Sequence, residues 1–221
     1  MYIQITTRCN MSCGHCCYAC NKKTGQDMPF KLFELIMEKW GNEITKVRKQ
    51  NVILGGGEPT VHPEFWKFVT LSLSYGIPWI ATNGKLTENA LLLAKLGKRN
   101  LISVVLSLDK WHEPIEQEVI DAFKEGLIKY EHPWISMIPP NKEQGMREIR
   151  SIKEPYKRGC YKEGFDQCPC SHIRIGPNGL IYGCGCTDAP VIGTVIDGFF
   201  DRFKNVPWDG TCSKDWEHIK K

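Results

Sequence analysis

The 221-residue sequence has no long apolar run, since its longest hydrophobic stretches are far shorter than the roughly 20 residues that cross a bilayer. It also lacks a long basic run, and its formal net charge of +4 is a mild excess that does not by itself indicate nucleic acid. Residues 1–8 are too short and too polar for the apolar part of a secretory signal. We therefore expect a cytoplasmic protein without a membrane partner, and nucleic acid stays open as a partner.

Cysteine is absent from residues 21–159, and this gap divides the eleven cysteines into two groups. The first group is Cys9, Cys13, Cys16, Cys17 and Cys20, and the second is Cys160, Cys168, Cys170, Cys184, Cys186 and Cys212. The number is odd, the density is below that of disulfide scaffolds, and disulfides are rare in a reducing cytosol. Metal or cluster ligation is therefore the favoured interpretation of both groups.

The residues between the two cysteine groups alternate short apolar runs with helical patterns. We expect strands at 2–7, 51–57, 77–84, 101–109 and 134–138, and helices at 29–40, 63–76, 87–97 and 115–130. Repeated βα units imply parallel strands joined by right-handed crossovers. A closed eight-stranded barrel needs roughly 250 residues. The predicted fold class is therefore α/β, a partial (β/α)6-like open barrel, with a doubly wound sheet as the second choice.

The last third of the chain differs in composition, because it is rich in Gly, Pro and Cys and has little helical period. The run "HIRIGPNGLIYGC" at 172–184 predicts a hairpin, with two apolar strands around Pro-Asn-Gly. We predict a barrel domain at 1–150 and a small cysteine-rich extension containing this hairpin at 151–221.

Unusual polar residues follow four of the predicted strands directly. "TRCN" follows the first strand, "GGGEP" closes the second, "TNG" closes the third and "SLD" closes the fourth. Because the carboxyl ends of parallel strands form one face, these segments should meet on one rim. Each has an ordinary alternative, since "GGGEP" and "TNG" can be plain turns and Ser107 and Asp109 can cap a helix. Zinc is the alternative for the cysteines, although no clean pair of C-x2-C units with zinc-finger spacing is present.

The order of these motifs resembles the signature of the radical S-adenosylmethionine (SAM) superfamily, over residues 1–138. The matching segments are Cys9-x3-Cys13-x2-Cys16 and "GGGEP" at 55–59. The resemblance implies a 4Fe–4S cluster held by Cys9, Cys13 and Cys16, with SAM on the fourth iron. It implies reductive cleavage of SAM to methionine and a 5′-deoxyadenosyl radical, which takes hydrogen from a substrate. An external flavodoxin- or ferredoxin-like electron donor would reduce the cluster.

The same resemblance places seven residues against SAM. They are His15, Gly56, Gly57, Glu58, Asn83, Ser107 and Asp109. The glutamate would accept hydrogen bonds from the SAM ammonium, and the two glycines would allow close backbone approach. The serine and the aspartate would hold the ribose, the asparagine the ribose or the methionine, and the histidine would lie near the adenine. Asp109, His112 and Cys17 stay open as general bases.

A second trio, Cys13-x3-Cys17-x2-Cys20, has the same spacing as the first. Cys9 directly follows the first predicted strand, which places it on the rim and favours the first trio. Cys17 and Cys20 would then be buried thiols or neighbours of the substrate pocket.

The segment "CPCSHIRIGPNGLIYGC" at 168–184 resembles the start of the SPASM and twitch extensions of radical SAM enzymes, with Cys168, Gly179 and Cys184 in matching positions. The resemblance implies an auxiliary 4Fe–4S cluster with Cys160, Cys168, Cys184 and Cys212 as ligands. Cys170 and Cys186 stay open as replacements, and a small zinc site is the alternative.

The predicted function is therefore that of a radical SAM enzyme, an oxidoreductase or modifying enzyme. Its substrate is open between a peptide, a small molecule and a modified nucleobase. The alternative is a zinc- or iron–sulfur-containing module that binds nucleic acid or protein without radical chemistry.

Overall fold

The computed structural model describes residues 2–14, 16, 18–47, 51–125, 130–131, 135–138, 147–152, 173–185 and 189–197. The helices are α1 (Phe30–Val47), α2 (Phe65–Leu73), α3 (Thr87–Lys98) and α4 (Gln117–Lys124), with a short 3-10 helix η1 (Pro59–Val61). The strands are β1 (Tyr2–Thr6), β2 (Asn51–Gly56), β3 (Ile77–Thr82), β4 (Ser103–Ser107), β5 (Tyr130–Glu131), β6 (Ile135–Ile138), β7 (Arg147–Ile152), β8 (Arg174–Ile175), β9 (Leu180–Tyr182) and β10 (Val191–Thr194). None of the helices in these ranges is long and apolar enough to cross a membrane.

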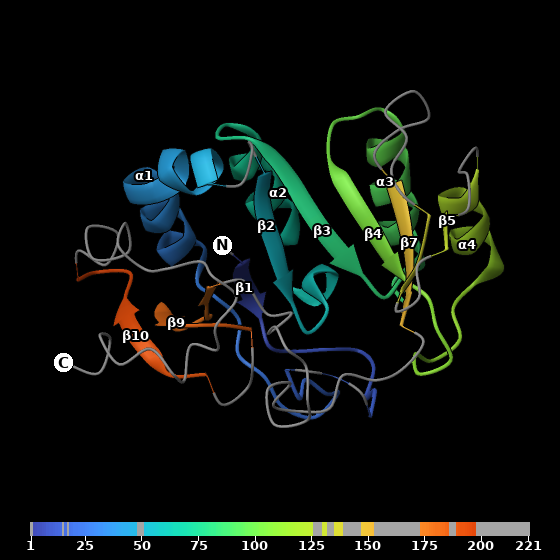
Figure 1. Ribbon diagram of the computed structural model, residues 1–221, viewed down its shortest axis with the longest axis horizontal. Helices are drawn as coiled ribbons and strands as arrows, with labels where there is room; N and C mark the ends of the chain where they lie inside the picture. The colour runs from blue at the N-terminus through green and yellow to red at the C-terminus, as the bar shows by residue number, and fades with distance from the viewer. Residues whose placement is uncertain are drawn as a thin grey trace.

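The described strands form one sheet in the order β10-β9-β8-β1-β2-β3-β4-β7-β6-β5. Its centre is parallel, since β1 pairs with β2, β2 with β3, β3 with β4 and β4 with β7, all in the same direction. In Figure 1 the arrows of β2, β3 and β4 point to the same lower edge, below which the blue segment after β1 crosses. The predicted α/β fold with a parallel sheet is confirmed, and the strand order is linear and open among these residues.

The core forms because the strands are apolar on both faces and each helix presents one apolar stripe. In β4 the three central residues are buried, as expected for a strand covered on both sides. In α1 the buried side chains recur at helical spacing, at Phe33, Ile36, Met37, Trp40 and Ile44. Helices α2, α3 and α4 contact β3, β4 and β7 respectively. The loops at the carboxyl ends of the strands are thereby fixed to a rigid support.

The predicted fifth parallel strand at 134–138 is wrong in its direction. Strand β6 (Ile135–Ile138) pairs antiparallel with β7, and it is β7 (Arg147–Ile152) that lies parallel to β4. The sequence of β7, "REIRSI", has charged residues at positions that are buried in the fold, so it does not resemble a central strand.

The guanidinium of Arg147 is 1% exposed and donates to the carbonyls of Ala122 and Glu125, at 2.5 and 2.6 Å. These bonds at the end of α4 satisfy a charge that the sequence pattern alone would place at the surface.

The predicted hairpin at 172–184 is confirmed, because β8 and β9 pair antiparallel. Gly179 in its turn has φ +77°, a conformation that glycine adopts without steric cost. Strand β8 also pairs parallel with β1, and the Tyr2 amide donates to the Ile173 carbonyl at 2.8 Å. The hairpin therefore extends the main sheet at the β1 edge. The domain boundary at 150/151 stays a prediction.

Candidate functional site

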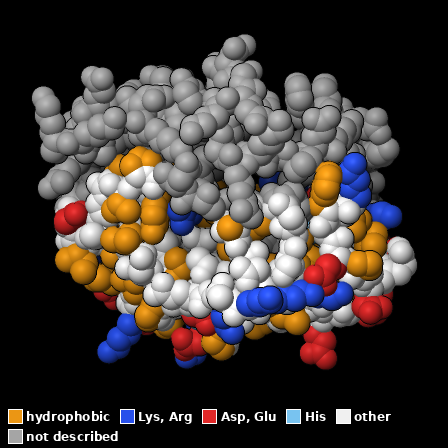
Figure 2. Space-filling model, turned by 90° about the horizontal axis from the view of Figure 1, so that it is seen from below, with side chains coloured by type: hydrophobic (Ala, Val, Ile, Leu, Met, Phe, Trp, Pro, Cys, Tyr) orange, Lys and Arg blue, Asp and Glu red, His pale blue; other side chains and the backbone are white. Residues whose placement is uncertain are grey.

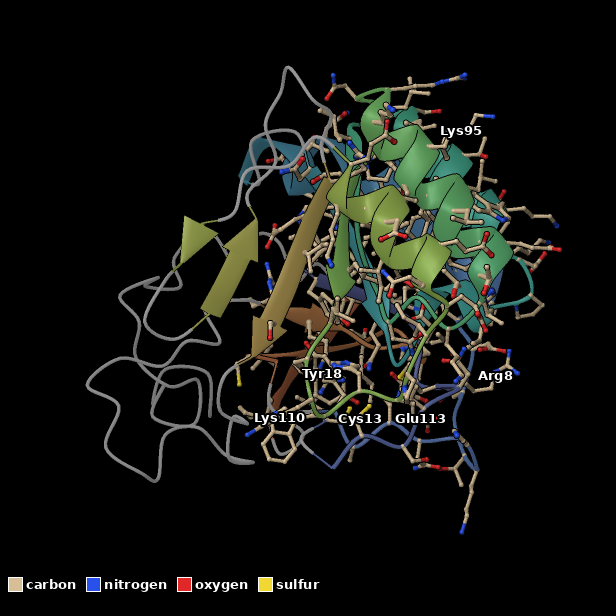
Figure 3. All side chains as sticks on the ribbon, turned by 90° about the vertical axis from the view of Figure 1, so that its right-hand side faces the viewer. Arg8, Cys13, Tyr18, Lys95, Lys110 and Glu113 are labelled. Atoms are coloured by element: carbon tan, nitrogen blue, oxygen red, sulfur yellow. The ribbon has the colours of Figure 1, made fainter. Side chains whose placement is uncertain are left out.

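Residues 7–28, which we call the cysteine loop, leave the carboxyl end of β1. Cys9, Cys13 and Cys16 are half-exposed on this loop, whereas Cys20 is buried. A turn forms around the second and third cysteines, since the Cys16 amide donates to the Cys13 carbonyl at 3.2 Å. In Figure 3, Cys13 lies at the same end of the molecule as Tyr18 and Glu113, opposite Lys95 on α3. Figure 2 looks onto this end, where backbone and uncharged polar atoms occupy the middle and charged side chains line the lower border.

The cysteine loop is anchored at its base by a paired arginine and aspartate. Arg8 binds both carboxylate oxygens of Asp27, through Nε at 3.0 Å and Nη2 at 2.8 Å, and Nη2 also donates to the Val61 carbonyl at 3.0 Å. Thr6 Oγ1 donates to the same carboxylate at 2.6 Å. Burial opposes ionisation of Asp27, but the bonds from Thr6 and Arg8 outweigh it and lower its pKa below 3.8. Arg8, the residue before Cys9, thus joins the start of the cysteine loop to Asp27 at its end and to Val61 in η1.

The loop after β4 contacts the cysteine loop from the other side. Glu113 forms an ion pair with Lys22 at 2.6 Å and a backbone hydrogen bond with Ser12. Asp109 has a side chain that is 1% exposed, and its Oδ1 accepts from the Trp111 amide at 2.9 Å and lies 2.8 Å from His112 Nδ1.

Cys13 lies on the cysteine loop, within reach of the negative charges on the loop after β4. Burial raises the pKa of the Cys13 thiol, and Cys16, Asp109 and Glu113 raise it further. Cys13 therefore faces an acidic part of the rim.

The glycine-rich turn after β2 packs against the backbone of the cysteine loop. Gly57 donates to the Thr6 carbonyl at 3.0 Å, and the Glu58 amide donates to the Arg8 carbonyl at 2.9 Å. A Cβ on Gly57 would lie 2.3 Å from the Arg8 oxygen and 3.0 Å from the Cys20 Cβ. A Cβ on Gly56 would likewise lie 2.3 Å from the Thr6 carbonyl oxygen. Both glycines thus allow the chain to approach itself closely, and their approach to SAM stays a prediction.

The carboxylate of Glu58 ties the end of β2 to the end of β3. The side chain is 1% exposed, and Oε1 accepts from Thr60 Oγ1 at 2.6 Å, the Thr60 amide at 3.2 Å and Thr82 Oγ1 at 2.9 Å. Oε2 accepts from the Asn83 amide at 2.7 Å. Burial raises the pKa of Glu58 above 4.5 even though all four of these bonds lower it. A cation beside this carboxylate would favour its ionised form.

Asn83 connects the Glu58 carboxylate to the first cysteine. Its Nδ2 donates to Asn10 Oδ1 at 2.8 Å and lies 3.8 Å from Cys9 Sγ. Its Oδ1 accepts from the Lys85 amide at 2.9 Å. A continuous chain of hydrogen bonds thus runs from β2 through the end of β3 to the cysteine loop.

The three half-exposed cysteines influence one another electrostatically. Burial raises the pKa of the Cys9 thiol to about 11, against a bond from the Met11 amide, and Glu58, Cys13 and Cys16 raise it further. Within the described ranges, no three His, Cys, Asp or Glu side chains lie close enough to hold a single metal ion. Thiolates at these positions need a cationic group to offset their mutual repulsion, and an iron–sulfur cluster has that property.

Apart from Cys184, which is described below, the predicted site residues fall into three sets. The structure brings Cys9, Cys13, Cys16, Gly56, Gly57, Glu58, Asn83 and Asp109 to one rim. Ser107 is the last residue of β4, two residues before Asp109. His15, Cys17, Cys160, Cys168 and Cys212 lie outside the described residues. The sequence did not predict that Thr60 and Thr82 bind Glu58 or that Asn10 binds Asn83. For Thr82 the available signal was its place at the end of an apolar strand, directly before "NG".

The second cysteine group is described only at Cys184, which follows β9 and is 2% exposed. It packs with Ala189 and Tyr182. The guanidinium of Arg174 lies over the Tyr182 ring at 3.9 Å and donates to Gln4 Oε1 at 2.8 Å. A Cβ on Gly185 would lie 3.3 Å from the hydroxyl of Tyr18 in the cysteine loop. The end of the hairpin therefore borders the first cysteine group.

Curated relatives match about half of the chain. A mycofactocin maturase of Mycobacterium ulcerans is 30% identical over 108 residues, which are 48% of this chain and 28% of the relative. A 7,8-dihydro-6-hydroxymethylpterin dimethyltransferase of Methanocaldococcus jannaschii is 30% identical over 138 residues, 55% and 27% of the two chains. A protein of Pyrococcus furiosus that modifies the cofactor of a tungsten-containing aldehyde ferredoxin oxidoreductase is 35% identical over 102 residues, 44% and 28%. The matches thus span little more than a quarter of these relatives.

Two solved structures share the fold over most of the chain. BtrN in complex with AdoMet and 2-DOIA has a TM-score of 0.59 at 15% identity, covering 94% of this chain and 82% of that one. The enzyme anSMEcpe with AdoMet and the Kp18Cys peptide has a TM-score of 0.55 at 14% identity, covering 94% and 80%. At these identities the likeness shows the fold alone.

A model of the radical SAM superfamily matches residues 3–129, which are more than half of the chain and include the cysteine loop, the glycine-rich turn and the loop after β4. The chain therefore belongs to the radical SAM superfamily.

Proposed function

We propose that the protein is a radical SAM enzyme that generates a 5′-deoxyadenosyl radical and uses it to take hydrogen from a substrate. One observation carries the proposal. Three half-exposed cysteines lie on the loop after β1, beside a buried carboxylate that joins the ends of β2 and β3. A module with a purely structural cluster needs cysteines, but it does not need a buried carboxylate beside them. The binding-module alternative leaves Glu58 unexplained.

Cys9, Cys13 and Cys16 fit a cluster with one open iron, because all three are half-exposed on the rim and three thiolates leave one of four irons without a protein ligand. When bound, the cluster supplies the electron that cleaves the C–S bond of SAM to methionine and the 5′-deoxyadenosyl radical, and an external flavodoxin- or ferredoxin-like donor supplies that electron. Cys20 does not share this exposure, since it is buried against Gly57.

Glu58 is the residue that we assign to the SAM ammonium. Its Oε1 accepts three hydrogen bonds, so Oε2, which accepts one from the Asn83 amide, is the oxygen with remaining capacity. The buried carboxylate would gain a cationic partner from SAM, which the chain does not provide among the bonds to Oε1 and Oε2. Ser107 and Asp109 are assigned to the ribose, and Asn83 and His15 to the remaining SAM contacts, by resemblance to the family.

Residues 151–221 are proposed to hold an auxiliary 4Fe–4S cluster, with Cys160, Cys168, Cys184 and Cys212 as ligands. The support from the described residues is that Cys184 follows a hairpin strand that is joined to β1 through β8. A cluster with four cysteine ligands has no open iron, so its role would be electron transfer.

The substrate class stays open between a peptide, a small molecule and a modified nucleobase. The relatives include maturation, methyltransfer and cofactor-modifying proteins, and the solved structures hold 2-DOIA or a peptide. These names describe diverse reactions, and the sequence matches cover only 26–28% of the relatives.

The decisive test is SAM cleavage by the anaerobically purified, iron-loaded protein. With dithionite as reductant, we expect methionine and 5′-deoxyadenosine to form in equal amounts. Iron-loaded protein that binds SAM without cleaving it would favour the binding module, and a protein that purifies with zinc instead of iron would overturn the proposal.

The auxiliary cluster is tested in a variant with Cys9, Cys13 and Cys16 all changed to Ala. We expect it to retain about four irons per chain and the broad 4Fe–4S absorption. A colourless variant that carries zinc would show that the C-terminal site is not a cluster. Iron that persists after Cys168→Ala and Cys184→Ala in this background would transfer the assignment to other cysteines, with Cys170 and Cys186 as the first candidates.

A further inference from the structure

We propose that Asn10 Nδ2 donates a hydrogen bond to a sulfur of the iron–sulfur cluster held through Cys9. This bond raises the reduction potential of the cluster. This inference rests on the proposed function, because it assumes that Cys9 ligates the cluster. It concerns a residue outside the motif cysteines and outside the residues assigned to SAM.

The orientation of the Asn10 amide follows from its neighbours. The Lys85 amide can only donate, so the Asn83 atom that accepts from it at 2.9 Å is Oδ1. The other atom of that amide is therefore Nδ2, and it donates to Asn10 at 2.8 Å. The accepting atom of Asn10 must then be Oδ1, which leaves Nδ2 as the atom that points elsewhere.

Asn10 Nδ2 is buried, with an accessible area below 1 Å², and it has no hydrogen-bond partner within the described part of the chain. A buried amide donor without an acceptor is costly, and native structures leave few of them. An acceptor supplied by a bound group would satisfy it. The neighbouring residue is Cys9, and the amide that binds Asn10 lies 3.8 Å from the Cys9 sulfur. The donor therefore belongs to a polar network that borders this sulfur.

Sulfur of a cluster is a suitable acceptor because it carries negative charge, which increases on reduction. A donor near that sulfur stabilises the reduced form more than the oxidised form, since the reduced form is the more negative. Hydrogen bonds to cluster sulfurs are among the determinants of reduction potential. The carboxylate of bound SAM could also accept from Asn10, and the two acceptors are distinguished by measuring the potential with and without SAM.

The test is a redox titration, followed by electron paramagnetic resonance, of the full iron-loaded chain without substrate, first in the absence of SAM and then in its presence. The signal of the variant that lacks Cys9, Cys13 and Cys16 is subtracted, so that only the cluster of the cysteine loop is observed. Asn10→Leu removes the donor without adding charge, and Asn10→Asp keeps Oδ1 for the bond from Asn83. Asn21→Asp is the control, because it adds the same charge to the exposed part of the same loop and keeps its own Oδ1 contacts with Lys23 and Thr24.

We expect both Asn10 variants to load iron as the unaltered protein does, and to have a more negative midpoint potential. For Asn10→Leu, the ratio of reduced to oxidised cluster at a fixed ambient potential should fall about tenfold, which is 59 mV for one electron. Asn21→Asp should change that ratio less than twofold.

An unchanged midpoint in iron-loaded Asn10→Leu would overturn the inference. A shift in Asn10→Asp alone would assign the effect to charge, and a shift that requires SAM would assign the donor to the SAM carboxylate; either result also overturns it. If Asn10→Leu does not fold, Asn10→Asp must still differ from Asn21→Asp for the inference to stand. Failure of the unaltered protein to bind a cluster at the first cysteine group is a different result, because it overturns the proposed function.

Discussion

The two cysteine groups differ in what surrounds them. Cys9, Cys13 and Cys16 are half-exposed on a loop fixed by side-chain bonds to η1, to Asn83 after β3 and to the loop after β4. Cys184 is 2% exposed and packs with Ala189 and Tyr182 at the end of a two-stranded hairpin. The first group has access to a molecule that binds at the rim, whereas Cys184 is enclosed by protein. This difference suits a catalytic cluster in the first region and an electron-transfer cluster in the second.

The largest expected effect separates the two possible trios within the first region. Cys9→Ala should abolish SAM cleavage, because a cluster with only two cysteine ligands from this loop would not be retained. Cys20→Ala should leave cleavage within a few-fold of the unaltered protein, because Cys20 is buried against the glycine-rich turn. The measurement is 5′-deoxyadenosine formed per iron-loaded chain.

Cys13 belongs to both trios and cannot distinguish them. Loss of cleavage in Cys20→Ala together with retention in Cys9→Ala would show that the second trio holds the cluster. The contrast between exposed and enclosed thiols would then no longer indicate which cysteines are ligands.

The next largest effect concerns Glu58, the buried carboxylate beside the first cysteine group. Glu58→Gln should weaken SAM binding about tenfold to a hundredfold, since a hydrogen bond to a charged group contributes roughly 1.5–3 kcal/mol. Equilibrium binding of SAM to the iron-loaded protein measures this. An affinity equal to that of the unaltered protein would show that Glu58 only joins the ends of β2 and β3.

The raised pKa of Glu58 provides a second measurement on the cluster-free protein. Above pH 4.5 the folded state keeps the Glu58 proton that the unfolded state has lost, so the free energy of unfolding falls as pH rises. Glu58→Gln removes this contribution. Urea titrations above pH 4.5 should therefore show a weaker decline of stability with pH in the variant.

The first region could be predicted further from sequence than the second for a physical reason. Cys9, Glu58, Asn83 and Asp109 each lie within three residues of the end of a strand, and parallel strands bring such positions to one edge whatever their side chains contact. The bonds that fix Glu58 were not predictable in this way. Thr82 lies 24 residues from Glu58 in the sequence. Its hydroxyl reaches Glu58 Oε1 only because of the register in which β2 and β3 pair.

The strands beyond α4 show where the periodic signal fails. The apolar run at 134–138 predicts a strand correctly, but side-chain type does not encode whether that strand runs parallel or antiparallel. Strand β7 was missed because Arg147 and Glu148 are buried there, at 1% and 6% exposure. Burial of these charges depends on acceptors at the end of α4, which become neighbours only in the folded chain.

A smaller effect tests how closely the cysteine loop must pack on the glycine-rich turn. Gly57→Ala should lower the free energy of unfolding by about 1–3 kcal/mol, because its Cβ would lie 2.3 Å from the Arg8 carbonyl oxygen. Gly14→Ala, in the cysteine loop, is the matched control, since no atom lies within 4 Å of the added Cβ. Urea unfolding of the cluster-free proteins compares them. Equal stability of the two variants would mean that the loop can move away from the turn at little cost.

The smallest expected effect concerns the ion pair at the base of the cysteine loop. Asp27→Asn should lower the free energy of unfolding at neutral pH by about 1 kcal/mol or less, because Arg8 and Asp27 are 43% and 28% exposed and solvent screens the pair.

The lowered pKa of Asp27 means that its contribution is fully present above pH 3.8 and is lost as pH falls through the folded-state pKa. The difference between the unaltered protein and the variant should therefore shrink on acidification, as urea titrations at neutral pH and at about pH 3 would measure. A difference that stays constant with pH would assign the effect to the hydrogen bond from Thr6 Oγ1 rather than to the charge, and the base of the loop would then be held by neutral contacts.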